Sequence, residues 1–192
     1  YSVLNQEIEK GLTMNNPARY TTTAIVLHWL VALLIGAAFV LGLVMTDMEL
    51  SPEKLQYFSW HKWLGVTIFA LVLFRIVWRA KHKAPSLPLQ MPGWQIAAAH
   101  GLHHLLYLLM VLVPVTGYLM SCAAGVQVVY FGVLPLPMMI EKNHDLKELF
   151  EEVHEVLANG MAVAVAIHVA AALKHQWVDR DKLLARMLPF LK

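Results

Sequence analysis

The sequence predicts an all-α integral membrane protein, built as a bundle of four membrane-spanning helices with both termini on the cytoplasmic side. Two features of the composition predict this class. Of the 192 residues, 58% are hydrophobic and only 15% are charged, whereas a soluble domain has about a quarter of its residues charged. The third observation is that the apolar residues form four runs of about twenty residues, which is the length that crosses the hydrocarbon core of a bilayer. The formal charge of +2 is too small to indicate nucleic-acid binding.

The four runs divide the chain into spans, loops and a short leader. The predicted spans cover residues 24–46, 58–78, 96–123 and 153–177. Residues 1–19 form a leader, native or added, that lacks the apolar core of a signal peptide. Residues 20–192 form the four-span domain, with no internal repeat and no second domain.

The positions of lysine and arginine predict the orientation in the membrane. Eleven of the fifteen lie in the N-terminal segment, the connection between the second and third spans, the C-terminal tail, or the helix ends beside them. Cytoplasmic loops carry the excess of basic residues. Both termini are therefore expected in the cytoplasm, and the other two loops face the outside.

Four histidines fall at two depths in these spans. His28 lies near the cytoplasmic end of the first span, and His61 lies near the outer end of the second. On the last span His154 is outer and His168 is cytoplasmic, fourteen residues further on. That spacing corresponds to about 21 Å along a helix and a rotation of about 40°, so both side chains share one face. The sequence therefore predicts two stacked sites, each with imidazoles on opposite sides.

The ligand set favours haem over zinc. Zinc takes four protein ligands, or three and a water, and no cysteine or intramembrane carboxylate lies nearby to complete either site. Haem iron needs only two axial imidazoles, and the single Cys122 excludes covalent attachment through CxxCH. Small residues would leave room for a porphyrin, or would simply allow helix packing. They are Gly36, Gly42, Gly65, Ala158, Gly160, Ala162, Ala164 and Ala166.

Other basic residues are weaker candidates. Haem propionates need cationic partners, and the candidates are Arg75 and Arg79 on the cytoplasmic side and Lys62 on the outer side. The alternative is that these residues only reflect the positive-inside rule and the snorkelling of long side chains to the membrane surface. His100, His103 and His104 open the third span at the depth of His28, where they are alternatives to it as ligand. His100 and His104 share a helical face, and His100 and His103 are candidate quinone contacts. The remaining histidines are interpreted as solvated. They are His82, His144 and His175.

Four segments carry a resemblance to a known family. They are VLHWLVALLI, WHKWLGV, AHGLHHLLYLLMVLVPVTGYLMS and EVHEVLANGMAVAVAIHVAAALKHQW. The chain from Tyr20 to Pro189 resembles the prokaryotic cytochrome b561 family and the related b-type subunits of hydrogenases and formate dehydrogenases. The resemblance implies a protein of the bacterial inner membrane with two haem b groups, which exchanges electrons with ubiquinone or another quinone. It also implies that His28 and His168 hold the cytoplasmic haem, and that His61 and His154 hold the outer one.

One type of member in this family oxidises superoxide at the outer face and reduces ubiquinone. The outer loops here carry nine carboxylates against four lysines, a net charge of about −5, which repels an anion unless a lysine focuses the field. Lys62, beside His61, is the best candidate for such steering. An acidic face better suits a basic electron-carrier protein. The rival interpretations are a haem-bearing anchor subunit of a larger dehydrogenase or hydrogenase, and a histidine-lined metal transporter. The oligomeric state and the direction of electron flow are left open.

Overall fold

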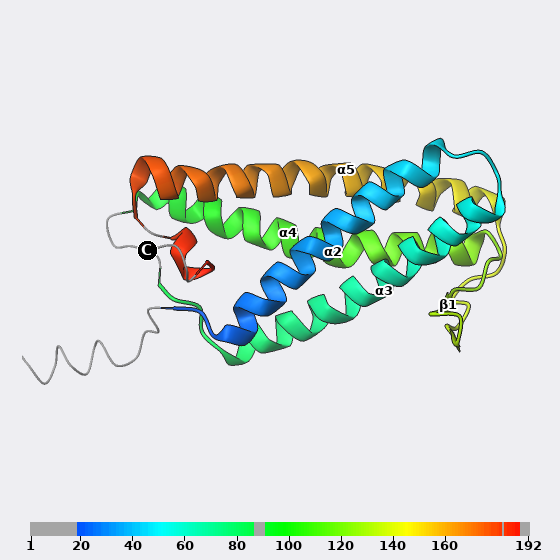
Figure 1. Ribbon diagram of the computed structural model, residues 1–192, viewed down its shortest axis with the longest axis horizontal. Coiled ribbons are helices and arrows are strands. Elements are labelled where there is room, and N and C mark those ends of the chain that lie inside the picture. The colour runs from blue at the N-terminus through cyan, green and yellow to red at the C-terminus, as the bar shows by residue number, and fades with distance from the viewer. Residues whose placement is uncertain (1–18, 87–90, 182, 189–192) are drawn as a thin grey trace, which may run out of the picture.

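The protein is a bundle of four long helices. The computed structural model describes residues 19–86, 91–181 and 183–188, so the leader predicted over residues 1–19 lies almost wholly outside the described residues. The helices are α2 (Thr22–Asp47), α3 (Pro52–Lys81), α4 (Gly93–Ala123) and α5 (His144–Lys174). All four are long and apolar enough to cross a membrane, which confirms the predicted all-α, four-span class (Figure 1).

The helices extend beyond the predicted spans because polar residues cap them outside the apolar runs. The Thr21 hydroxyl accepts a hydrogen bond from the Ala24 amide at the start of α2. Ser51 caps α3 through the Lys54 amide, and Asn143 caps α5 through the Leu146 amide. Such side chains satisfy amides that have no partner inside the helix. The α5 helix therefore begins at His144, well before the apolar run that starts at Val153.

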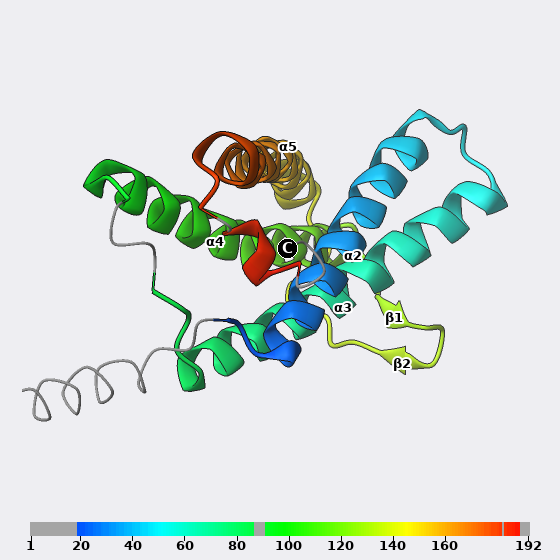
Figure 2. The same ribbon diagram turned by 60° about the vertical axis from the view of Figure 1, so that its left-hand side comes forward.

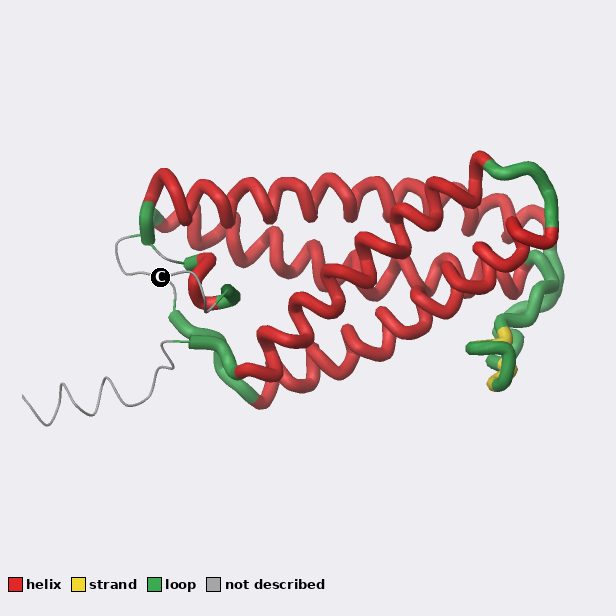
Figure 3. The backbone as a smooth tube through the Cα atoms, viewed as in Figure 1, coloured by secondary structure: helices red, strands yellow, loops and turns green. Residues whose placement is uncertain are grey.

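The helices pack in sequence order. The α2 helix packs along α3, α3 along α4, and α4 along α5, and Figure 2 shows α2 with α3 diverging from α4 with α5. Within these fully described helices, α5 does not pack along α2 or α3. The loops gather at the two ends of the bundle (Figure 3). We call the end with the start of α2 and the end of α5 the basic end, and the opposite end the acidic end.

An apolar layer fills the middle of the bundle. Each helix contributes to it. On α3 the layer lies between His61 and Arg75, and on α5 it lies between His154 and His168. The layer consists of Val31, Ile68, Val72, Leu109, Met110, Val113, Met161 and Ala164. Many large apolar side chains on the outside of the helices are exposed, as expected where lipid covers the surface.

The connection between α4 and α5 contains a small hairpin that the sequence analysis did not predict. Strands β1 (Val129–Tyr130) and β2 (Leu134–Pro135) pair antiparallel. Positive φ angles at Phe131 and Gly132 make the turn. The Trp63 indole donates a hydrogen bond to the Val129 carbonyl at 2.8 Å, and Tyr130 shares a 2.8 Å hydrogen bond with Thr67. These two contacts fix the hairpin against α3 at the acidic end.

After α5 the chain turns back at the basic end. A π-helical turn, η1 (His175–Asp179), is followed by Arg180 in the left-handed conformation and by a 3-10 turn, η2 (Leu184–Arg186). The His175 Nδ1 lies 2.6 Å from the Asp181 carboxylate and 3.1 Å from that of Asp179. The interpretation of His175 as a solvated side chain is therefore wrong, because the turn buries most of it against two carboxylates.

Candidate functional site

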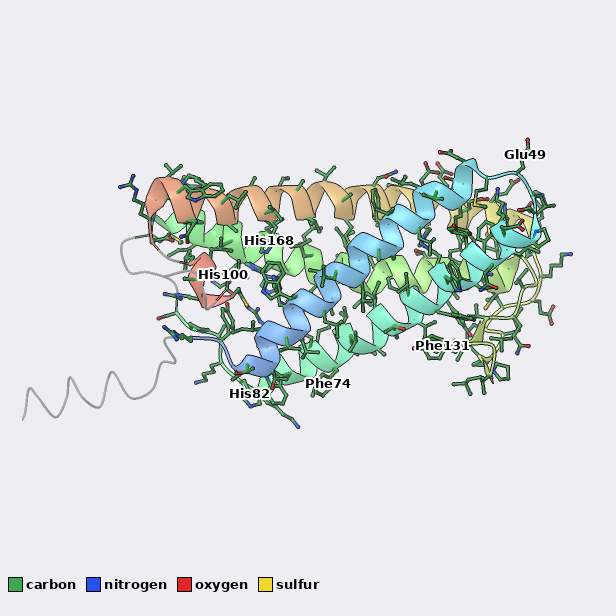
Figure 4. The ribbon with its side chains drawn as sticks, viewed as in Figure 1. Glu49, Phe74, His82, His100, Phe131 and His168 are labelled. Atoms are coloured by element: carbon green, nitrogen blue, oxygen red, sulfur yellow. The ribbon has the colours of Figure 1, made fainter. Side chains whose placement is uncertain are left out.

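Two pairs of histidines face each other inside the bundle. The ring centroids of His28 on α2 and His168 on α5 are 6.1 Å apart, with the planes at 66°. Those of His61 on α3 and His154 on α5 are 6.2 Å apart, with the planes at 84°. All four imidazoles are partly buried, and Figure 4 shows His168 on the side of α5 that faces the interior. The pairs that share a depth in the sequence are therefore brought together in space.

The spacing of each pair would allow both imidazoles to bind one iron. A metal–nitrogen bond is about 2 Å long, and the centre of an imidazole lies about 1 Å beyond the nitrogen. Two imidazoles bound to opposite sides of one iron therefore have ring centres about 6 Å apart. Both pairs match this value. Each pair also joins α5 to a helix that does not pack along it, which would leave room for a macrocycle.

The donor set does not fit a closed zinc site. Among the described residues, the one cluster of three or more His, Cys, Asp or Glu ligands at metal-binding separation is His175, Asp179 and Asp181. It lies at the basic end, outside both histidine pairs. Each pair therefore offers two neutral nitrogens and no further ligand, which suits haem iron and not a tetrahedral ion.

Backbone carbonyls orient the pair at the acidic end. The Nδ1 of His61 donates to the carbonyl of Ala38 at 3.0 Å, and the Nδ1 of His154 donates to the carbonyl of Val113 at 2.9 Å. A histidine that holds a metal commonly donates its other N–H in this way. Both hydrogen bonds place the proton on Nδ1 and leave the lone pair of Nε2 available. These two imidazoles are therefore already in the tautomer that binds iron through Nε2.

A glycine on α4 makes room for His154. A Cβ atom built on Gly117 would lie 2.9 Å from Cε1 and 3.1 Å from Nδ1 of His154, closer than van der Waals contact allows. The Thr116 hydroxyl lies 3.3 Å from the same Nδ1. Gly117 and the two carbonyls could not be predicted from the sequence, because nothing local indicates which backbone atoms a histidine of another helix will approach.

The pair at the basic end is held differently. The Arg75 guanidinium donates to Nδ1 of His28 at 3.0 Å, and its Nε donates to the Tyr107 hydroxyl at 3.1 Å. A guanidinium has no acceptor, so Nδ1 of His28 accepts and the ring proton is on Nε2. This is the tautomer opposite to that of His61 and His154. For His28 to bind iron through Nε2, Arg75 has to leave Nδ1.

The third-span histidines are not placed as their grouping suggested. His103 turns toward the site, and its ring centroid lies 5.2 Å from that of His168. The helix face that carries His100 and His104 points away from the site. Its Nδ1 donates to the Ala99 carbonyl at 2.6 Å. His100 and His104 are exposed, and Figure 4 shows His100 at the same end of the bundle as His168.

The remaining predicted site residues are Arg79 and Lys62. The Arg79 guanidinium lies over the Tyr107 ring, 5.7 Å from its centroid, and the side chain is exposed. Lys62 follows His61 on α3 and is partly buried. Within the described part of the chain, no hydrogen bond or ion pair of Lys62 is seen.

A multi-pass membrane bundle with two interior imidazole pairs at this spacing defines the class of membrane proteins able to hold b-type haem. Residues 19–190 match the family "Prokaryotic cytochrome b561", and the chain belongs to this family, whose members bind b-type haem and act in electron transport. It is 31% identical to "Cytochrome b561 homolog 2" of Escherichia coli (strain K12), over 91% of this chain and 93% of that protein. It is 29% identical to "Probable superoxide oxidase CybB" of Yersinia pestis, over 89% of this chain and 96% of that protein. It is also 29% identical to "Cytochrome b562" of Cereibacter sphaeroides, over 91% of this chain and 98% of that protein.

Proposed function

We propose that this chain is a dihaem b-type cytochrome that carries electrons across the bacterial inner membrane and exchanges them with a quinone. The observation that supports this most directly is the presence of two imidazole pairs with ring centroids 6.1 and 6.2 Å apart, each of which would hold one haem iron. Both pairs use α5, fourteen residues apart. The two sites therefore lie about 21 Å apart along that helix, at different depths in the bilayer.

Each site has its own set of protein groups. His61 and His154 hold the haem at the acidic end, and His28 and His168 hold the haem at the basic end. When bound, each haem accepts and releases one electron at a time. The Ala38 and Val113 carbonyls fix the imidazole rings. The apolar layer keeps water out of the space between the two sites.

The basic end faces the cytoplasm in this proposal, because eleven of the fifteen lysines and arginines lie there or in the termini. Arg75 is the first candidate for a propionate partner, since it must leave His28 when iron binds and then needs an anion. Arg79 is the second candidate. His103 lies against His168, with its Nδ1 held by Ala99, and His100 lies at the same end. These two histidines are placed to exchange protons with a quinone.

The electron donor at the acidic end is superoxide or an electron-carrier protein. A relative named "Probable superoxide oxidase CybB" favours superoxide. Two of the four lysines at this end already have partners, since Lys147 pairs with Glu151 and Lys54 donates to the Met48 carbonyl at 2.6 Å. Of the remaining two, Lys142 and Lys62, Lys62 follows the imidazole of His61 on α3 and is therefore the best candidate to attract an anion to the site. The surrounding carboxylates support a basic carrier protein as the second candidate.

Haem quantification in ligand variants tests this function. The purified chain should contain two haem groups, and acid–acetone should extract both because neither is covalent. His61→Ala or His154→Ala should each remove one haem, and His28→Ala or His168→Ala should each remove the other, as shown by reduced-minus-oxidised spectra.

An exposed histidine on the same bundle provides the matched control: His104→Ala should keep both haem groups. A wild-type ratio near one haem per chain would contradict the dihaem proposal. Loss of a haem in His103→Ala with full retention in His28→Ala would instead assign the basic-end ligand to α4.

A further inference from the structure

A small cavity with a basic lining lies at the basic end of the bundle. It has a volume of about 30 Å³ and lies between the start of α2, the end of α3, and Tyr107 of α4. Four basic side chains line it, and among the described residues of its lining there is no aspartate or glutamate. The basic residues are Arg75, Arg79, His82 and Lys83. Arg75 forms the wall toward His28, and the other three lie at the surface.

Neighbouring side chains hold these cations together. The guanidinium carbons of Arg75 and Arg79 lie 5.6 and 5.7 Å from the centroid of the same Tyr107 ring. In the described part of the chain, neither arginine forms an ion pair with a carboxylate. The Tyr107 ring attracts both guanidiniums, and an anion beside them would stabilise the two like charges further. Arg75 already donates to His28 and Tyr107, so Arg79 is the cation of this pair that remains available to an anion, either a haem propionate or a ligand from outside the protein.

The cavity is small, so only a small group of such a ligand would enter it. A cavity needs about 10–15 Å³ to hold one water molecule, so a volume of about 30 Å³ admits about two to three water-sized atoms. This is room for the two non-bridging oxygens of a phosphodiester group, with the rest of the ligand outside the cavity. Guanidinium binds phosphate oxygens, like those of a carboxylate, through paired hydrogen bonds.

An aromatic row connects the cavity to the lipid-facing side of α3. The Trp78 ring stacks on His82 with centroids 4.0 Å apart, and the Phe74 ring lies 6.1 Å from Trp78. The Trp78 indole donates to the Thr21 hydroxyl in the cavity wall at 3.1 Å. Phe74 and Val77 are exposed on the apolar surface beside this row, and Figure 4 shows Phe74 and His82 along the same outer edge of α3. An acyl chain at Phe74 and a headgroup at His82 would belong to one lipid molecule.

We propose that this cavity binds the phosphate group of an anionic phospholipid from the leaflet at the basic end. Arg79, His82 and Lys83 bind the phosphate oxygens, and the chain of the lipid lies along Phe74 and Val77. Basic pockets between membrane helices on the cytoplasmic side are known to bind such headgroups. The proposal rests on one part of the proposed function, namely that the four helices span the bilayer with the basic end at one leaflet. It does not depend on how many haem groups the protein binds.

Native mass spectrometry of the haem-loaded full chain tests this site. The protein is released from nanodiscs made of phosphatidylglycerol and phosphatidylcholine in equal amounts, and the retained lipids are counted. The wild type should retain one phosphatidylglycerol in preference to phosphatidylcholine. Arg79→Gln with Lys83→Gln should reduce that preference about 25-fold, at about fivefold for each cation removed. Lys81→Gln, an exposed cation on the same helix end that does not line the cavity, should leave it unchanged.

Three results would overturn the proposal. The first is equal retention of both lipids by the wild type. The second is loss of haem in the double variant with the lipid preference intact, which would assign the cations to a haem propionate. The third is complete displacement of phosphatidylglycerol by millimolar inorganic phosphate, which would assign them to free phosphate. If the double variant does not fold, Lys83→Gln alone, beyond the end of α3, should still show the fivefold loss.

Discussion

Gly117→Ala should weaken haem binding at the acidic end by a steric effect on one ligand. The added Cβ would lie 2.9 Å from Cε1 of His154, whereas carbon atoms in contact are about 3.5 Å apart. The ring must therefore move by roughly 0.6 Å, against the 2.9 Å hydrogen bond that ties its Nδ1 to Val113. Overpacking of this kind costs about 1–3 kcal/mol, which corresponds to about 5- to 150-fold weaker binding at that site.

Transfer of haem to excess apomyoglobin measures this effect. In the wild type both haem groups should leave slowly, whereas in Gly117→Ala one of the two should leave faster by that factor. The faster component should be the one that is missing in His61→Ala. Gly101→Ala is the matched control, because it makes the same change on the same helix where a Cβ meets nothing within 4 Å. Equal rates of haem loss in Gly117→Ala and wild type would refute the role of the close approach.

Two further predictions concern charge at each end of the bundle. Arg75→Gln removes the cation that adjoins the imidazoles of the basic-end site. Because Arg75 would leave His28 Nδ1 when iron binds but stay beside the haem as a propionate partner, the midpoint potential of the basic-end haem should fall by on the order of 50 mV, about 1 kcal/mol for a one-electron couple. An optical redox titration measures both midpoint potentials. Arg75→Lys keeps the positive charge, so its basic-end potential should stay close to that of the wild type. If Arg75→Gln leaves both potentials unchanged, electrostatic tuning by Arg75 is excluded. Lys62→Gln should slow the reduction of oxidised protein by superoxide in stopped-flow mixing and weaken its dependence on salt. Lys147→Gln is the control, because that lysine is already paired with Glu151, and it should change neither the rate nor its dependence on salt. A reduction rate that changes neither with salt nor in Lys62→Gln would disprove steering.

The sequence by itself determined the four spans and the depths of the histidines. Hydropathy is a property of each run alone, and a helix that crosses the bilayer has a fixed rise per residue. The fourteen residues from His154 to His168 therefore set two depths and one face before any packing is known. His28 and His61 could be matched to those depths in the same way. The bundle brings these residues together as two pairs.

Only the tertiary structure decided how each helix is rotated and how closely it approaches its neighbours. The rotation of α4 turns His103 toward His168 and leaves His100 and His104 exposed. The approach of α4 to α5 places Gly117 against His154, and the approach of α3 to α2 gives His28 an arginine partner. These features depend on how side chains of different helices fit together. No periodicity within one helix encodes that fit, so they had to be read from the packed bundle.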